Sequence, residues 1–343
     1  TNNESLDYPS FFISSVKTLM AQKIGAYLET EDRSIISVDL FSKERNNNQQ
    51  ADSLSIKMKY RDEIQNMTPT IDIAPIYEMY RAKGCDFEAT MNAVVADFSA
   101  KSDRMPAWDK KKIDSVPYIL ENCFIRLVNR STNENIIENC PHTEFHDLEM
   151  VYRVMVSTEA DNMASYLVTN DVLEKTGISQ EVLHEAAYKN TREMLPIRAE
   201  KLTDIVRNNM ISNGMDEEMV KEMVPDGDQI VLTNEKFIYG ATSMIYLDVL
   251  QKLAEEYDSS FVVMPSSVNE VILTPMADNA AMREMYVLSK MVEDVNRTTV
   301  NIEDQLSNEV YFYNKNTRTL LPVADAPELK ETIAQEKMFG KNL

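Results

Sequence analysis

The chain has 343 residues, of which 43% are hydrophobic, and its formal net charge is -21. A chain of this length and hydrophobicity can bury a substantial core, spread over about two domains. The negative charge opposes binding to the phosphate backbone of nucleic acids and to anionic membrane surfaces, so we expect neither kind of partner. A protein partner or self-association is compatible with this composition.

The glycines exclude three common modes of nucleotide binding. Only seven glycines occur, and the closest pairs, Gly214 with Gly227 and Gly227 with Gly240, are 13 residues apart. A P-loop, a dinucleotide-binding turn and a kinase glycine loop all need glycines near one another, because their backbone N–H groups must approach phosphate. We therefore predict no nucleotide bound in these modes, and we expect no other cofactor.

The cysteines and the hydropathy indicate a cytoplasmic protein. Cys85, Cys123 and Cys140 are odd in number, widely spaced and without a CxxC pair, as is typical of a reducing compartment. The most apolar long stretch, from Phe237 to Leu250, is too short to span a bilayer. The chain does not open with a basic segment and a long apolar one, although a start at Thr1 is compatible with removal of a leader.

Residues 1–105 are predicted to form a small region of helices and a three-stranded antiparallel meander. A helix is expected from Pro9, because proline favours the first helical position. A second amphipathic helix is expected after Asp86, which is a favoured N-cap residue. Period-two alternation predicts three strands, at 36–40, 54–60 and 70–73.

The middle strand of this meander, 54–60, alternates without a break. Its apolar side chains should lie under the two helices and its polar side chains should face water, because successive side chains of a strand point to opposite faces. The expected buried set is Leu54, Ile56 and Met58, and the expected exposed set is Ser55, Lys57 and Lys59.

A mixed-charge stretch from Ala100 to Val116 predicts a junction, which Trp108 would pin in place. Residues 115–322 are expected to form a larger region of strands and helices, and residues 323–343 a tail that is helical or partly disordered. Hairpins are predicted where apolar runs flank a turn, at 149–157 with 165–169, at 261–275, and at 309–313 with 318–321. This pattern predicts the α+β class, with mixed, largely antiparallel sheets and packed helices.

The stretch FVVMPSSVNEVILTP, residues 261–275, raises the question of a serine nucleophile. A nucleophile elbow needs glycine on both sides of the serine, whereas Pro265 and Val268 flank Ser266 and Ser267. Pro-Ser-Ser between two apolar runs is instead good turn chemistry. We interpret the stretch as a hairpin with a polar turn.

The segment Cys140-Pro-His-Thr-Glu-Phe-His146 is a second candidate for chemistry. Thiolate and imidazole suit Zn²⁺, so Cys140, His142 and His146 are the candidate metal ligands, with Cys123 as a fourth. His142, His146 and Glu144 are the candidate catalytic residues of a hydrolase-like enzyme. A turn with polar histidines explains the same pattern, so the segment alone predicts neither a metal site nor a catalytic one.

The last predicted hairpin, 309–313 with 318–321, carries aromatic residues on both faces. An edge strand that contains Tyr311, Phe312 and Tyr313 would be a template for pairing with another chain. Two outcomes are open. Either the tail covers this hairpin and leaves a monomer, or the hairpin forms a homodimer or receives a protein ligand.

Five segments, in consistent order between about Ser10 and Tyr313, carry a resemblance to a known family. They are SIKMKYRDEIQNMTPTIDIAPIYEMY, PHTEFHDLEMVYRV, YLVTNDVL, IVLTNEKFIYGATSMIYLDVL and FVVMPSSVNEVILTP. The chain resembles an uncharacterised family found mainly in gut Firmicutes, the domain of unknown function 5688. The resemblance implies a cytoplasmic bacterial protein and carries no activity with it. It also implies a histidine where this chain has Asn269, beside Glu270, and that difference disfavours an enzyme.

The sequence as a whole predicts a non-catalytic binding or interaction protein, with a partner that the sequence does not identify. The alternative is a hydrolase-like or metal-dependent enzyme that uses the region of Cys140, His142 and His146. An apolar concavity that holds one of these histidines with convergent carboxylates would favour the enzyme, and an open sheet edge would favour interaction. Nucleic-acid binding is the least favoured class because of the charge.

Overall fold

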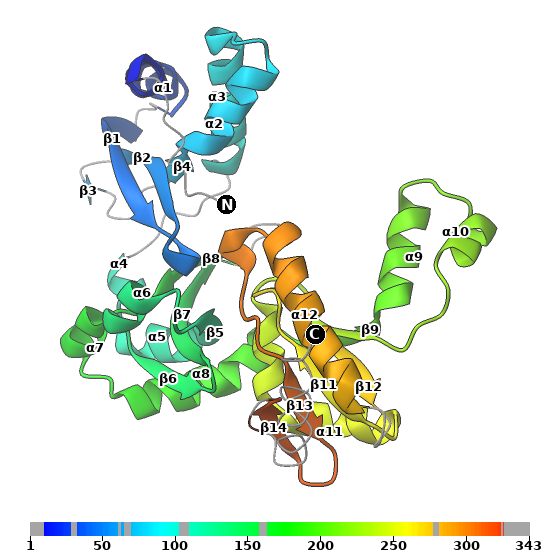
Figure 1. The fold of residues 1–343 in the computed structure, drawn as a ribbon. Coiled ribbons are helices and arrows are strands. Elements are labelled where there is room, and N and C mark those ends of the chain that lie inside the picture. Colours follow the sequence, from blue (N-terminus) through cyan, green and yellow to red (C-terminus); the bar gives the residue numbers. More distant parts are fainter. Residues whose placement is uncertain are drawn as a thin grey trace, which may run out of the picture. The chain divides into compact units, whose positions relative to one another are not determined.

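The chain forms two compact units, Thr1–Ser115 and Val116–Leu343. The computed structural model in Figure 1 describes residues 10–28, 33–60, 63–64, 70–102, 110–157, 163–276, 281–323 and 325. The predictions for Trp108 and for nearly all of the tail, 323–343, concern residues outside these ranges. Within the described part of the chain, no helix has the length and apolar character that crossing a bilayer requires.

The first unit is a small sheet covered by helices, and its central strand is β2. This strand pairs antiparallel with β1, β3 and β4. The helices α1 and α3 contribute apolar side chains to one face of the sheet. The elements are α1 (Ser10–Leu28), β1 (Arg33–Glu44), η1 (Asn46–Asn48), β2 (Gln50–Tyr60), β3 (Glu63–Ile64), β4 (Thr70–Asp72), α2 (Ile73–Ala82), α3 (Phe87–Ser102) and α4 (Lys110–Ile113).

The alternation in β2 places its described apolar side chains inside, as predicted. Leu54 and Ile56 are fully buried and belong to one cluster with residues of α1 and α3. Lys57, which follows Ile56, is exposed, and Ser55 and Lys59 are half-buried. The burial of Met58 lies outside the described side chains. β2 is therefore the middle strand between β1 and β4, and β4 corresponds to the third predicted strand.

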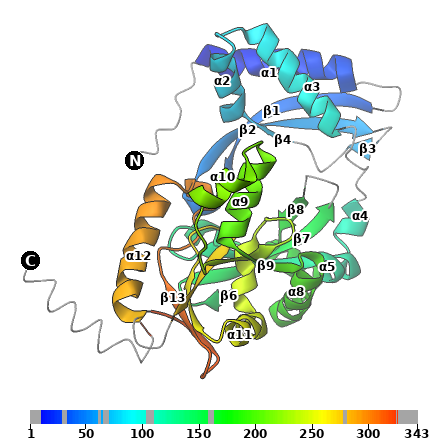
Figure 2. The same cartoon turned by 90° about the vertical axis from the view of Figure 1, so that its right-hand side faces the viewer.

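The second unit contains two antiparallel sheets (Figures 1 and 2). In the four-stranded sheet, β7 pairs with β5, β6 and β8. The six-stranded sheet has the order β14-β13-β11-β12-β10-β9. The strands are β5 (Cys123–Asn129), β6 (His142–Phe145), β7 (Leu148–Ser157), β8 (Ala164–Leu167), β9 (Ile197–Lys201), β10 (Ile230–Asn234), β11 (Ser260–Met264), β12 (Val271–Met276), β13 (Tyr311–Asn314) and β14 (Thr319–Pro322).

Helices connect and cover these sheets. Ser179 caps α8 by accepting a hydrogen bond from the Val182 N–H, as its sequence predicts. The helices are α5 (Val116–Asn122), α6 (Glu134–Glu138), α7 (Asn170–Thr176), α8 (Gln180–Met194), α9 (Leu202–Ser212), α10 (Glu217–Met223), η2 (Gly240–Ile245), α11 (Leu247–Glu256), α12 (Ala281–Thr298) and η3 (Ile302–Asp304). The predicted α+β class is confirmed.

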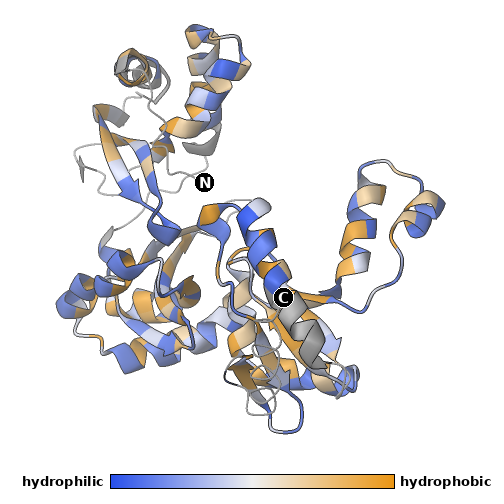
Figure 3. Ribbon diagram, in the orientation of Figure 1, coloured by the Kyte–Doolittle hydropathy of each residue, from blue (hydrophilic) through white to orange (hydrophobic). Residues whose placement is uncertain are grey.

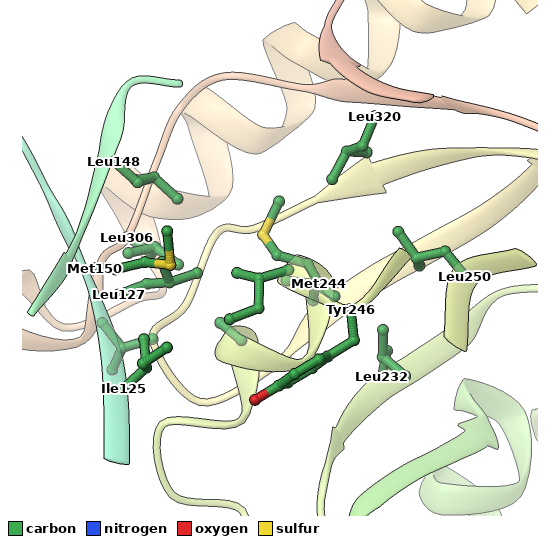
Figure 4. Packing of buried hydrophobic residues seen from close by; sticks show 14 of the residues in the cluster. Ile125, Leu127, Leu148, Met150, Leu232, Met244, Tyr246, Leu250, Leu306 and Leu320 are labelled. Atoms are coloured by element: carbon green, nitrogen blue, oxygen red, sulfur yellow. The ribbon is translucent and has the colours of Figure 1, made fainter. Parts of the chain in front are cut away.

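One apolar core joins the two sheets of the second unit. Figure 4 shows Ile125 and Met150 of the four-stranded sheet in the same cluster as Leu232, Met244 and Leu250. The other face of the six-stranded sheet packs on α12 through a separate apolar cluster. The helix α8 covers β5, with its apolar residues in the main core. The two sheets are therefore held to each other by burial of apolar surface rather than by shared strands.

The aromatic hairpin near the C-terminal end is not the exposed edge that the sequence suggested. β13 pairs with β11 on one side and with β14 on the other. Tyr311 and Tyr313 are fully buried in the main core, and Phe312 packs against the α12 cluster. The two tyrosines tolerate burial because their hydroxyl groups are hydrogen-bonded. The Tyr311 hydroxyl donates to the carboxylate of Asp147, and the Tyr313 hydroxyl donates to Gln251 Oε1.

The central strand of the first unit allows a test of its core. Ile56→Ala should lower the unfolding free energy of this unit by about 2–5 kcal/mol, because it removes a fully buried side chain and leaves a cavity. Lys57→Ala, which alters an exposed neighbour, should change it by less than about 0.5 kcal/mol. Hydrogen exchange of the β2 amides in the full chain measures both. Equal protection in the two variants would contradict this assignment of the core.

Candidate functional site

The predicted Cys-His segment folds into the β6–β7 hairpin and the turn before it. Cys140 is buried with Val128 and Val151, and burial raises the pKa of its thiol to about 12. The Nδ1 atom of His142 lies 3.0 Å from the Cys140 carbonyl oxygen. Cys123 belongs to the main core instead, and burial raises its thiol pKa to about 11. Both thiols are thus protonated, inert core residues at neutral pH.

His146 lies in the turn between β6 and β7, with a positive φ of 58°. Its ring contacts the rings of Phe145 and Tyr311, at centroid distances of 4.8 and 5.4 Å. Burial lowers the pKa of this imidazole, although the carboxylates of Asp147 and Glu144 act in the opposite sense. His146 thus faces the β13 side of the core.

Glu144 forms an ion pair with Arg130 at 3.0 Å, and Arg130 Nε also donates to Glu149 Oε1 at 2.6 Å. Arg130 Nη2 donates in addition to the His146 carbonyl oxygen, at 2.8 Å. These contacts fix the hairpin turn. Among the described residues, no group of three or more His, Cys, Asp or Glu side chains is placed to hold a metal ion. The structure therefore does not bring Cys140, His142 and His146 together as one donor set.

A different set of side chains converges on the same sheet, on the face that also carries His142 of β6. Arg126 of β5 lies opposite Val151 of β7, and Arg153 follows two residues later on that strand. Opposed residues share a face, and so do residues two apart, so both arginines project from one face as diagonal neighbours. Ile125 and Tyr152, on the other face, point into the main core.

Tyr239, from the connection between β10 and η2, packs over both arginines. The guanidinium carbon of Arg126 lies 4.7 Å from the centre of the Tyr239 ring, and that of Arg153 lies 5.9 Å from it. The ring of Phe124 stacks on Tyr239 at 6.2 Å. The three side chains thus form an arginine–tyrosine–arginine cluster, Arg126–Tyr239–Arg153, that joins the two sheets.

The two arginines of this cluster differ in their hydrogen bonds. Arg153 donates from Nε to Ser165 Oγ at 2.9 Å and from Nη2 to the Ser165 carbonyl oxygen at 2.8 Å. Arg126 Nε is buried and has no hydrogen-bond partner. Burial lowers the pKa of Arg126 to about 10, and the neighbouring Arg153 charge acts in the same sense. The Nε of Arg126 is therefore a buried donor without an acceptor in the described chain, on a side chain that is otherwise partly exposed.

Carboxylates near the cluster act on Arg126 only at longer range. The charges of Asp304 and Glu303 favour the charged form of Arg126, without an ion pair to it in the described part of the chain. Glu270 is half-buried, and burial raises the pKa of its carboxyl, as does the neighbouring Asp304. The cluster thus lies beside an acidic rim but is not neutralised by it.

Two polar loops hold Tyr239 in this position. In the first, Asn234 Oδ1 accepts from the backbone N–H of Lys236 at 3.0 Å, and its Nδ2 donates to the Ile238 carbonyl oxygen at 2.7 Å. In the second, Asn269 Oδ1 accepts from the Tyr239 N–H at 3.2 Å. Tyr239 itself has a positive φ of 53°, which is unfavourable for a residue with a Cβ. The hydrogen bonds on both sides of Tyr239 offset that strain.

The loop between β11 and β12 has a structural role, as the sequence suggested for its serines. Ser267 Oγ accepts from the Asn269 N–H at 3.0 Å, and the carbonyl oxygen of Ser266 accepts from the Leu306 N–H at 3.1 Å. The position where the family resemblance implied histidine is thus filled by Asn269, which binds Tyr239 rather than presenting a reactive group.

Neither arginine was predicted from the sequence as a site residue. Each one interrupts an apolar strand, in CFIRLVN for Arg126 and in MVYRVMV for Arg153. A charged residue inside a run that would otherwise be buried on both faces needs a partner, and that is the signal that was available.

Comparison with known proteins places the chain in a family without fixing its activity. The pattern that defines a family of unknown function (DUF5688) matches residues 10–315, so the chain belongs to this family. No curated protein and no solved structure matches the chain.

Gly240→Ala tests the contact between the two loops. A Cβ at this position would overlap Thr233 Oγ1 and the Asn269 carbonyl oxygen, so we expect a loss of about 2–4 kcal/mol of unfolding free energy. Gly227→Ala is the control, because its Cβ would meet only the end of the Thr203 side chain, at 3.3 Å. Urea unfolding measures both, and a small effect at Gly240 would contradict the close packing of the loops.

Glu270→Gln tests the electrostatics beside the cluster. The folded-state pKa of Glu270 is raised, so the folded protein holds this proton to a higher pH than the unfolded chain does, and stability falls as the pH rises above about 4. The variant should therefore be more stable than the wild type at pH 7 and equal to it below about pH 4. Glu256→Gln, at an exposed position of α11, is the control in thermal unfolding at both pH values. A destabilised Glu270→Gln variant at pH 7 would contradict this sign.

Proposed function

We propose that this member of the DUF5688 family is a non-catalytic binding protein whose ligand presents an anionic group to Arg126 and Arg153. The observation that carries the proposal is the buried Nε of Arg126, which has no hydrogen-bond partner. A guanidinium offers five N–H donors in a plane that matches carboxylate and phosphate oxygens. A bound anion would supply the acceptors that the described chain does not.

The magnitudes favour an anion over the bare cluster. Even partial burial of an unpaired charge costs free energy, and a second positive charge beside it adds to that cost. Stacking on a tyrosine returns about 0.5–2 kcal/mol. An anion between Arg126 and Arg153 would offset the remainder and would do so on a surface that Tyr239 already holds in place.

Another arginine of the same unit, Arg192, combines stacking on a tyrosine with a carboxylate partner. Arg192 also stacks on a tyrosine, with its guanidinium carbon 4.8 Å from the ring centre of Tyr246. It donates in addition to both carboxylate oxygens of Asp248, at 3.2 and 2.8 Å. Arg126 has the same stacking without the carboxylate, so the missing part of its environment is an anion.

The non-catalytic part of the proposal rests on the groups around the cluster. Ser267 and Asn269 are engaged in loop hydrogen bonds, His146 contacts Tyr311, and His142 is separated from Arg126 by the intervening strand residue Val151. General acid–base chemistry needs a proton-transfer group within hydrogen-bond reach of the bound group. The arrangement around Arg126 supports recognition rather than reaction.

A cytoplasmic location is part of the same proposal. Cys85, Cys123 and Cys140 are all unpaired, and Cys85 is exposed. Free thiols of this kind are compatible with a reducing compartment. A small anionic metabolite or an acidic side chain of a protein partner would both be available there.

Arg126→Met tests the proposal. Without added anion, the variant should be as stable as the wild type or more stable, because it removes a partly buried charge with an unsatisfied Nε and roughly keeps the volume. Inorganic phosphate or succinate at ten times its Kd should stabilise the wild type by about 1.4 kcal/mol, or about 3–6 °C in Tm, and should not stabilise the variant. Thermal unfolding and titration calorimetry measure both effects, and the two anions distinguish phosphate from carboxylate recognition.

Arg192→Met is the matched control, since it removes a stacked arginine that already has a carboxylate partner. It should lose stability and keep the response to the anion. An anion response that is equal in Arg126→Met and wild type, or absent from the wild type with both anions, would contradict the proposal.

A further inference from the structure

The helical hairpin of α9 and α10, residues 202–228, exposes apolar side chains. It is inserted between β9 and β10 and extends beyond that edge of the six-stranded sheet in Figure 1. Met219 and Met223 are 54% and 57% exposed, and Val206 and Ile211 are exposed as well. Figure 3 shows apolar residues on both helices of the hairpin.

The hairpin is an ordered element rather than a frayed segment. Asp216 caps α10 by accepting hydrogen bonds from the N–H groups of Glu218 and Met219, at 3.1 and 3.2 Å. Arg207 of α9 donates twice to the Val224 carbonyl oxygen and pairs with Asp226 at 2.8 Å, which closes the hairpin at its base. The exposed methionines are thus presented on a fixed surface.

The geometry of α10 separates its inner and outer faces. Val220 is buried, whereas Met219 and Met223, which are four residues apart, form one exposed stripe. Methionine side chains adapt to different partner shapes at low cost, which is why they recur on surfaces that receive helices. The stripe is therefore suited to an apolar face of another helix.

The charge around this stripe selects the partner. Residues 202–228 contain seven acidic residues and two basic ones, for a net charge of -5. One of the two basic residues, Arg207, is already paired with Asp226. A second copy of this hairpin, a nucleic acid or an anionic membrane would meet like charge, whereas a basic surface would be attracted.

We infer that the α9–α10 hairpin is a docking surface for a basic amphipathic helix of a partner protein. The apolar face of that helix packs on Met219 and Met223, and its lysine and arginine residues meet Glu218 and Glu222, which flank the stripe on α10. The partner helix would thus be recognised by the exposed methionine stripe of α10 and by the acidic residues beside it. It uses none of the residues of the Arg126–Tyr239–Arg153 cluster and is independent of the proposed anion site.

The test uses a labelled 18-residue helical peptide of leucine and lysine, with leucine at helical spacing, and fluorescence anisotropy with the full chain at 0.15 M salt. The double variant Met219→Gln/Met223→Gln should weaken binding at least tenfold. Met291→Gln is the matched control, because Met291 is 54% exposed on α12, and it should bind as the wild type does. Glu218→Gln/Glu222→Gln should weaken binding about threefold, and its effect should shrink at 0.5 M salt.

Circular dichroism and Tm establish that each variant is folded, so that lost binding is not lost structure. A leucine–glutamate peptide of the same pattern should not bind. Binding that is equal in wild type and in both hairpin variants would show general attraction to an acidic protein and overturn the inference. So would a wild type that does not bind the basic peptide, or sedimentation that shows dimers dependent on Met219 and Met223, since that would assign the face to a second copy.

Discussion

The close approach of two loops at Gly240 is the constraint on which the second unit depends. Thr233 Oγ1 donates to the Asn269 carbonyl oxygen at 2.7 Å, and the Ala241 N–H donates to the Val268 carbonyl oxygen at 3.2 Å. Only a glycine hydrogen fits between these groups. The direction in which the chain leaves Gly240 is thereby fixed, and so is the position of Tyr239 over the arginines of the other sheet.

This arrangement couples the apolar core to the polar cluster. The core residues of η2, which follow Gly240 directly, pack between the two sheets, while Tyr239, immediately before Gly240, packs on the arginine face of the four-stranded sheet. A shift of the loops would therefore disturb both the main core and the cluster. Because the protein fixes both arginines before any ligand arrives, an anion that binds there would lose less free energy to ordering of side chains.

The sequence predicts strands and caps well where one local rule acts, as in β2, in the β7–β8 and β13–β14 hairpins and at Ser179. It fails where burial depends on distant partners. Tyr311 reads as an exposed edge residue until Asp147, 164 positions earlier, accepts its hydroxyl hydrogen.

The candidate site shows the same limit. The Cys140–His146 segment has chemically attractive residues close in sequence, yet they run along the strand β6 and its ends and do not converge as one donor set. Arg126 and Arg153 are 27 positions apart and have no motif, but the register of β5 and β7 makes them neighbours. Local periodicity can predict the strands, but strand register, which depends on turns and core packing, decides which charges meet.

The net charge and the arginine cluster act over different distances, and together they restrict the ligand. Repulsion from a chain of net charge -21 extends over about a Debye length, roughly 8 Å at physiological salt, and grows with the number of negative charges on the approaching molecule. Attraction to Arg126 and Arg153 is strong only at contact, where water is excluded. A polyanion such as RNA meets the long-range repulsion with every phosphate and gains from few of them at the cluster. A small anion, or a single acidic group on a partner that is otherwise neutral or basic, meets little repulsion and gains the full contact.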